Sequence, residues 1–185
     1  MLVWSALSLT ASFVLAIEAV ALAGDPGKVF SCDINAVVSC GTVGSSWQAS
    51  VFGFPNAFLG LVTEPVVLTI ATASLGGVRF PRWFMLAAQT GYAVGLGLAY
   101  WLLYQAVFNI GAVCPWCLLV TVATTCVFFE MTRINVLDGH LPLPARVRRF
   151  AEEVIRSRLD LLAVLVWLLG VALLLVSRYG AALFA

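Results

Sequence analysis

Four of the five cysteines in this chain occur as two closely spaced pairs. Cys114 and Cys117 bracket a proline and a tryptophan in CPWC, and Cys32 and Cys40 stand at the two ends of CDINAVVSC. Sulfurs one helical turn apart are close enough to bridge, and a mobile pair near a second pair can pass electrons by thiol–disulfide exchange. The residue types and their spacing are therefore those of a redox relay.

Other interpretations of these cysteines remain open from the sequence. A Cys-x-x-Cys pair can occur by chance, and a disulfide between Cys32 and Cys40 could merely staple a loop. Structural zinc commonly takes two closely spaced ligand pairs, which the wide spacing of Cys32 and Cys40 does not provide, so we expect no metal. His140 falls in another connection and offers no Cys–His catalysis. Cys126 lies deep in an apolar run and is expected to be inert.

The elements that position the cysteines are predicted to be transmembrane helices. Hydrophobic residues make up 62% of the chain and charged residues 10%, which indicates an integral membrane protein. A helix needs roughly 20 apolar residues to cross a bilayer. Five runs are long enough: about 2–23, 57–75, 83–107, 113–130 and 160–177. The first exceeds the usual signal-peptide core, so we expect it to be a retained span.

The distribution of basic residues predicts the orientation. Arginines concentrate in 76–82 and 131–159, whereas the other side carries only Lys28 and Arg178. The positive-inside rule then gives a cytoplasmic N-terminus and places both cysteine pairs outside. That compartment permits disulfides. The net charge of +1 gives no electrostatic case for nucleic acid.

The position of CPWC at a helix start favours reactivity. Pro115 suits the first helical turn, and a cysteine there feels unpaired backbone N–H groups that lower its pKa. A soluble thiol could reach one end of such a relay. The other end lies at the membrane surface and needs a lipid-soluble acceptor, which a quinone would provide.

With these residues in view, the chain resembles the vitamin K epoxide reductase family, specifically its prokaryotic disulfide-forming members. The resemblance lies in CD followed by seven residues to Cys40, then Ser46, Asn56 and Cys114-x-x-Cys117, over roughly residues 10 to 130. It implies an all-α integral membrane fold, a four-helix bundle around a quinone with a peripheral fifth helix. We expect one domain over 1–185, with a catalytic core at about 2–130, a cytoplasmic linker at 131–159 and a fifth span at about 160–177.

The resemblance also implies a route for electrons. Cys32 would exchange with a thioredoxin-like protein, Cys40 would pass electrons to Cys114, and Cys117 would deliver them to menaquinone or ubiquinone. The expected activity is that of a thiol:quinone oxidoreductase of the bacterial cytoplasmic membrane, which supports disulfide formation in exported proteins. The alternatives are a quinone-epoxide reductase of the same family and a non-enzymatic membrane protein with structural outer disulfides.

Further residues have two interpretations each. By the resemblance Ser46 and Asn56 would line or bind the quinone site, although a helix cap and a turn residue are equally ordinary roles. Thr121 stands where animal members have a tyrosine, which argues against epoxide chemistry. No fused thioredoxin-like domain is visible, so the partner is expected to be a separate protein.

Several apolar and acidic residues complete the expected membrane core. Glu18 and Glu64 fall inside spans, where a carboxylate suggests either a proton supply or an interhelical hydrogen bond. Trp47 and Trp116 could border the quinone or anchor the protein at the interface. The stretch SSWQASVFGFP is expected to form an amphipathic half-helix cap, and the glycines of GYAVGLGLAY are expected to allow close helix packing.

Overall fold

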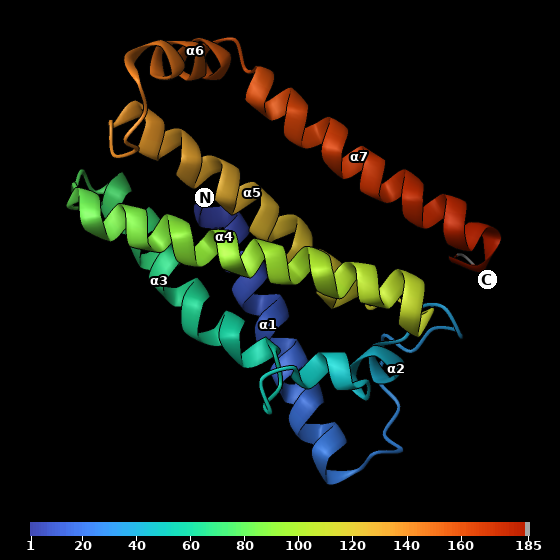
Figure 1. The fold of residues 1–185 in the computed structure, drawn as a ribbon. Coiled ribbons are helices and arrows are strands. Elements are labelled where there is room, and N and C mark those ends of the chain that lie inside the picture. The colour runs from blue at the N-terminus through green and yellow to red at the C-terminus, as the bar shows by residue number, and fades with distance from the viewer. Residues whose placement is uncertain (184–185) are drawn as a thin grey trace.

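The computed structural model describes residues 1–183, which form a bundle of long helices (Figure 1). The all-α membrane architecture is confirmed, since five helices of the described part are long and apolar enough to cross a membrane. They are α1 (Leu2–Gly24), α3 (Ala57–Leu75), α4 (Arg82–Gln105) with its π-helical extension η2 (Ala106–Ile110), α5 (Pro115–Leu137) and α7 (Leu159–Tyr179). Helix α5 runs to Leu137, beyond the predicted end of the span at residue 130, and Arg133 in this added part pairs with Asp160, 3.1 Å away.

The core of the bundle is formed by α1, α3, α4 and α5. Helix α1 packs against α3 and α5, and α4 packs against α5. The buried face of α1 consists of small residues, which let neighbouring backbones approach closely. These residues are Ser5, Ser8, Ala11, Ser12 and Ala16.

The closest approach of α1 and α3 depends on Gly60. A Cβ atom at this position would lie 2.7 Å from Ser12 Cβ and would overlap the serine side chain. We expect Gly60→Ala to lower the free energy of unfolding by about 1–3 kcal/mol, the usual cost of overpacking. Thermal unfolding of the purified protein, followed by tryptophan fluorescence, measures this. Gly170→Ala in α7 is the control, because no atom lies within 4 Å of its added Cβ. Equal melting of the two variants would contradict the prediction.

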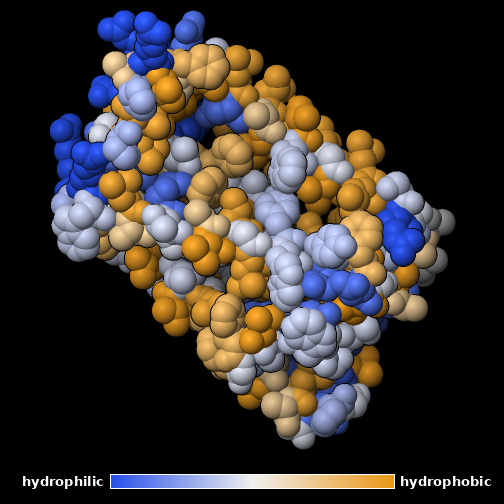
Figure 2. Space-filling view, in the orientation of Figure 1, coloured by the Kyte–Doolittle hydropathy of each residue, from blue (hydrophilic) through white to orange (hydrophobic). Residues whose placement is uncertain are grey.

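Helix α7 stands at the periphery, as the sequence predicts. It runs beside α5 in Figure 1 and is linked to it by α6 (Ala145–Arg156). Two of its contacts with the core are polar: the Trp167 indole N–H donates to the Tyr100 hydroxyl at 2.6 Å, and Asp160 pairs with Arg133. Near its C-terminal end, Leu175 and Tyr179 pack against a buried hydrophobic cluster that includes Val107. Figure 2 shows hydrophobic side chains over much of the visible flank of the molecule, the surface expected to face lipid.

The two arginine-rich connections lie at the same end of the bundle. Arg82, at the start of α4, donates from Nε to the backbone carbonyl of His140 at 2.7 Å. The turn between α3 and α4 therefore touches the connection that follows α5. Some of the most hydrophilic residues gather at this end, around α6 (Figure 2).

The opposite end is capped by short turns instead of the expected amphipathic half-helix. They are α2 (Cys40–Gly44) and the 3-10 turn η1 (Trp47–Ser50). Gly53, with φ of 81°, and Pro55 prevent a longer helix from forming. The Asn56 N–H closes this loop by donating to the Ala49 carbonyl at 2.8 Å. Phe52 and Phe54 remain exposed on its outside, 55% and 40% accessible.

Candidate redox site

The two cysteine-bearing segments are held together by backbone hydrogen bonds. The N–H of Val113 donates to the carbonyl of Val37 at 2.8 Å, and the N–H of Ser39 donates to the carbonyl of Val113 at 3.1 Å. These bonds form a parallel bridge between Val38 and Val113. Because Cys40 and Cys114 follow this bridge by two residues and one residue, the backbone pairing brings them side by side.

Three of the four predicted redox cysteines form one buried cluster. Cys32 and Cys40 are joined by a disulfide, and Cys114 and Cys117 are thiols. The Cys114 thiol lies 3.3 Å from Sγ of Cys40. Cys32, Cys40 and Cys114 are each less than 10% exposed, and Cys117 packs against them. The thiol of one pair is therefore in contact with the disulfide of the other.

Cys114 occupies the N-terminal cap of α5, with Pro115 in the first turn. Its sulfur accepts a hydrogen bond from the Cys117 backbone N–H at 3.3 Å. A hydrogen bond from the Cys117 thiol lowers the pKa of the Cys114 thiol, burial opposes this shift, and the backbone N–H groups of Cys117 and Trp116 reinforce it. A lower pKa raises the fraction of thiolate, which is the nucleophile in disulfide exchange.

The Asp33 carboxylate orders the loop that carries the disulfide. It accepts hydrogen bonds from the backbone N–H groups of Phe30 and Gly41, at 2.7 and 2.8 Å, and from the Ser39 hydroxyl at 2.7 Å. Burial would raise the pKa of Asp33, but these hydrogen bonds outweigh burial and hold the pKa below its usual range. Both ends of the Cys32–Cys40 loop are thus fixed by one charged group.

The loop order should depend on the Asp33 charge. Because the pKa is lower in the ordered loop, the carboxylate stabilises that loop above its ordinary pKa, and this contribution is lost as pH falls through the lowered value. We expect the Gly41 amide resonance in an NMR titration to shift with a midpoint below that of a free aspartate. Asp33→Asn should remove the transition, whereas Asp25→Asn, outside this network, should keep it. A transition that persists in Asp33→Asn would assign it to another group.

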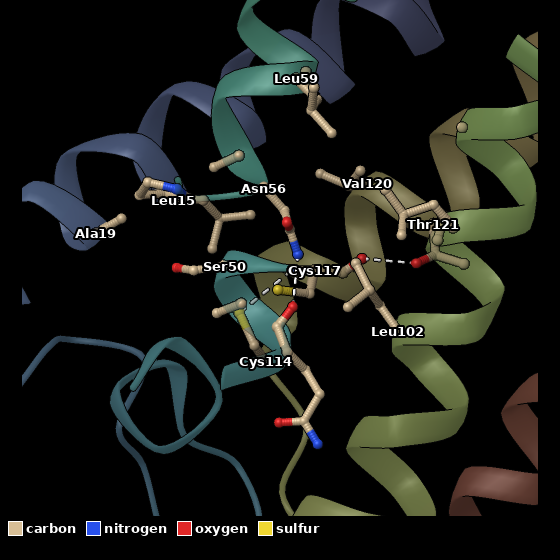
Figure 3. Close-up of a pocket in the computed structure, with 18 of the residues that line it drawn as sticks. Leu15, Ala19, Ser50, Asn56, Leu59, Leu102, Cys114, Cys117, Val120 and Thr121 are labelled. Atoms are coloured by element: carbon tan, nitrogen blue, oxygen red, sulfur yellow. Dashed lines mark hydrogen bonds between the residues drawn. The ribbon is translucent and has the colours of Figure 1, made fainter. Parts of the chain in front are cut away.

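A large apolar cavity adjoins the cysteines. It has a volume of about 1310 Å³ and is lined by parts of α1, α3, α4, α5 and the capping turns. In Figure 3 the labelled side chains from these elements surround one space, and Cys114 and Cys117 are among the residues that line it. Val62 of α3 and Val94 of α4 line the cavity and are also 71% and 70% exposed. The cavity is therefore accessible from the flank of the bundle between these two helices.

The glycines of α4 serve this cavity, so the expectation that they allow close helix packing is wrong. Gly91, Gly95 and Gly97 line the cavity, and no atom lies within 4 Å of a Cβ added to any of them. The missing side chains leave open volume rather than a tight helix contact. Trp101 lines the cavity, whereas neither Trp47 nor Trp116 belongs to the lining.

Ser46 and Asn56 both line the cavity, but they differ in what they can offer. The Ser46 hydroxyl donates a hydrogen bond to the Val43 carbonyl at 2.6 Å. The Asn56 side chain donates from Nδ2 to the Gln48 carbonyl at 2.7 Å, while its buried Oδ1 has no partner among the described residues. The Thr121 hydroxyl donates to the Cys117 carbonyl at 2.9 Å. Of these three residues, Asn56 is thus the one with a buried polar atom that has no partner in the described part of the chain.

The two intramembrane acids have different surroundings. Glu64 is buried between helices, where its Oε1 accepts from the Ser8 hydroxyl of α1 at 2.8 Å and the Tyr92 hydroxyl of α4 at 2.9 Å. These contacts are interhelical hydrogen bonds, one of the two interpretations that the sequence allows for this acid. Glu18 instead reaches the disulfide, with Oε1 3.3 Å from Sγ of Cys32.

Two features of the site were missed from the sequence. The bridge of Val38 and Val113 has a weak local signal, a β-branched residue shortly before a cysteine in both AVVSC and GAVC. The contact between Glu18 and Cys32 has no local signal, because α1 and the loop are brought together only by the fold.

A buried thiol in contact with a disulfide, beside an apolar cavity inside a helical membrane bundle, is an arrangement that permits thiol–disulfide exchange in a membrane protein. The family model of the vitamin K epoxide reductase family matches residues 1–132, and the chain belongs to this family. Its members are quinone-linked thiol oxidoreductases or epoxide reductases. A comparison with curated protein sequences found no significant match.

Proposed function

We propose that this protein is a thiol:quinone oxidoreductase that oxidises a separate thioredoxin-like protein and so supports disulfide formation in exported proteins. The observation that carries the proposal is the 3.3 Å contact between the Cys114 thiol and Sγ of Cys40. Disulfide exchange requires a sulfur nucleophile next to a disulfide sulfur, and this contact supplies that arrangement. Cys117, one helical turn further, lines the apolar cavity.

The exchange would begin with Cys32. A thiolate of the reduced thioredoxin-like protein, here called the carrier, attacks Cys32, forms a mixed disulfide and releases Cys40. Cys40 attacks Cys114 in a Cys114–Cys117 disulfide and releases Cys117. The second carrier thiol then displaces Cys32, which attacks Cys40 and releases Cys114. The carrier leaves oxidised, and the remaining bonding, a Cys32–Cys40 disulfide with two thiols at Cys114 and Cys117, is that of the described structure.

The cavity residues fit a quinone. When bound, a quinone supplies an acceptor for two electrons and two protons. Cys117 would donate electrons at the edge of the cavity, and the unpartnered Oδ1 of Asn56 could accept a hydrogen bond from a quinol hydroxyl. Apolar side chains such as Leu59, Leu102 and Val120 would hold the ring (Figure 3). The volume exceeds the ~300–1,000 Å³ of ordinary ligand pockets, which leaves room for part of a polyprenyl chain.

The orientation in the membrane follows from the arginines. We place the arginine-rich end in the cytoplasm of a bacterium and the cysteines outside its inner membrane, by the positive-inside rule. The Arg82 contact with His140 supports this, because it brings both basic connections to one end. The cysteines then face the compartment in which disulfides persist.

Purified protein in lipid nanodiscs tests the function. Reduced thioredoxin-like protein would be added with a quinone (menaquinone or ubiquinone) or with a quinone epoxide as the acceptor, and the thiols of the thioredoxin-like protein and the reduced acceptor would be followed together. We expect one quinol for each carrier disulfide formed. Preferential consumption of a quinone epoxide would instead favour the epoxide reductase. If neither acceptor is consumed, the cysteines are structural and the proposal is wrong.

A further inference from the structure

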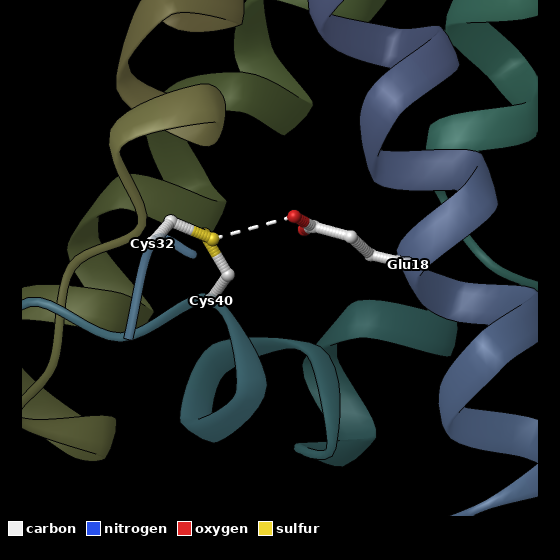
Figure 4. Close-up of side chains that lie close together, drawn as sticks. All are labelled: Glu18, Cys32 and Cys40. Carbon is white, nitrogen blue, oxygen red and sulfur yellow. Dashed lines mark hydrogen bonds between the residues drawn. A yellow bond between two sulfur atoms is a disulfide. The ribbon is translucent and has the colours of Figure 1, made fainter. Parts of the chain in front are cut away.

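The carboxyl group of Glu18 contacts the disulfide from the side opposite to its loop. Glu18 extends from α1 toward Cys32 in Figure 4, and its Oε1 lies 3.3 Å from Cys32 Sγ. A disulfide sulfur carries no hydrogen. The contact is therefore a hydrogen bond only when the carboxyl group itself carries the proton and donates it to sulfur.

Nothing cationic is paired with Glu18 in the described part of the chain, where the recorded ion pairs involve other groups. The titratable groups that face it are Asp33 in the loop and the thiols of Cys114 and Cys117 at the start of α5. All of these are acids, so none of the described groups that face Glu18 supplies a positive charge to hold it ionised. The group is placed to keep and release a proton next to sulfur.

We propose that Glu18 is a catalytic acid–base residue that transfers a proton to and from Cys32 during exchange between the two cysteine pairs. The inference deepens the proposed function and rests on it for the direction of electron flow. When the Cys114 thiolate attacks Cys40, a Cys40–Cys114 bond forms and the Cys32–Cys40 bond breaks. The electron pair of the broken bond stays on Cys32, and the Glu18 proton moves to that sulfur.

In the direction of the proposed relay the same atoms move in reverse. The Glu18 carboxylate takes the proton from the Cys32 thiol, and Cys32 attacks Cys40 in the Cys40–Cys114 bridge. The Cys32–Cys40 disulfide is restored, and Cys114 leaves as a thiolate. Its charge is received by the backbone N–H at the start of α5.

Cys32 and Cys114, the two sulfurs that exchange at Cys40, thus differ in how the charge of their thiolates is stabilised. Cys114 has the N–H groups of a helix terminus, which stabilise a thiolate. Cys32 is 7% exposed and lies in a loop, where its recorded polar side-chain neighbour is Glu18. A buried thiolate without a donor is costly, so proton transfer from Glu18 removes the charge as it forms.

The exchange step can be measured without a carrier protein or a quinone. In a Cys117→Ala background, Cys114 can react only with the Cys32–Cys40 pair. Protein held at acidic pH is shifted to neutral pH, quenched by alkylation at intervals, and analysed by mass spectrometry for Cys40–Cys114 and Cys32–Cys40 peptides. If the proposed function is wrong, the quinone assay will fail, but the rate of exchange between the two cysteine pairs can still be measured. The two failures are therefore distinguishable.

Glu18→Gln should slow this exchange by roughly 100-fold, the low end of general acid–base effects. It should also remove one inflection from the pH–rate profile, and Glu18→Asp should restore part of the rate. Glu64→Gln is the matched control, because it removes the other intramembrane carboxyl and should leave the rate unchanged. Equal rates and profiles in Glu18→Gln and Glu64→Gln would overturn the proposal.

A second measurement covers the case in which Glu18→Gln does not fold. With Glu18 intact, proton transfer in the exchange step should slow the reaction in deuterated solvent relative to water. Folding of each variant is checked by its thermal unfolding and by its Cys32–Cys40 disulfide. The absence of a solvent isotope effect on the exchange with Glu18 in place would equally refute the assignment.

Discussion

Replacement of Cys114 by serine is expected to abolish electron transfer between the two cysteine pairs. The Cys114 sulfur lies 3.3 Å from Cys40 and is the thiol in contact with that disulfide. A serine hydroxyl has nearly the same shape but cannot form a bond to sulfur that exchanges. Quinone-dependent oxidation of the carrier should therefore fall to the level measured without protein, while the Cys32–Cys40 disulfide still forms.

Cys126→Ser provides the matched control. Cys126 is also a buried thiol of α5, but it lies nine residues beyond Cys117 and outside the cysteine cluster. Its replacement should leave the oxidation rate unchanged. If Cys114→Ser retained more than a small fraction of the activity, another route for electrons would have to exist.

The second large effect is expected for Cys117→Ala. In the proposed relay Cys117 is the thiol released when Cys40 attacks Cys114, and it lines the proposed quinone site. Without it, electrons have no thiol from which to enter the quinone. We expect complete loss of quinol formation, with the protein still inserted in the membrane.

Cys117→Ala should also leave a chemical trace that Cys114→Ser cannot leave. A fraction of the molecules should carry a disulfide between Cys40 and Cys114, detected by peptide mapping after alkylation at acidic pH. The double variant Cys114→Ser with Cys117→Ala is the control and should show the Cys32–Cys40 disulfide alone. Normal quinol formation by Cys117→Ala would refute its assignment as the electron donor to quinone.

Much of the bundle could be predicted because its signals are local. Apolar runs give the spans directly, since a helix is the structure that satisfies its own backbone in lipid. Pro115 and the two cysteines around it indicate a helix start, and α5 does begin at Pro115. The basic connections were expected on one side, and Arg82 and His140 place them in contact.

The parts that could not be predicted depend on contacts between distant segments. The glycines of α4 suggest close packing by composition, but Gly91 and Gly95 face a cavity whose existence depends on three other helices. Glu18 was identified as a costly intramembrane acid, yet its partner is a sulfur in a loop. Trp47 and Phe52 suggest a half-helix, but the 3-10 turn η1 ends at Ser50, and Gly53 three residues later has a positive φ.

The backbone bridge of Val38 and Val113 has a consequence for competition with small thiols. Because main-chain atoms hold Cys40 and Cys114 together, their reaction is intramolecular and has a high effective molarity, which for well-oriented groups can reach about 10⁵ M or more. Soluble thiols at millimolar concentrations cannot match that value. In the proposed relay, the transfer between the two pairs would thereby be insulated from the surrounding thiol pool, while a protein partner would enter at Cys32.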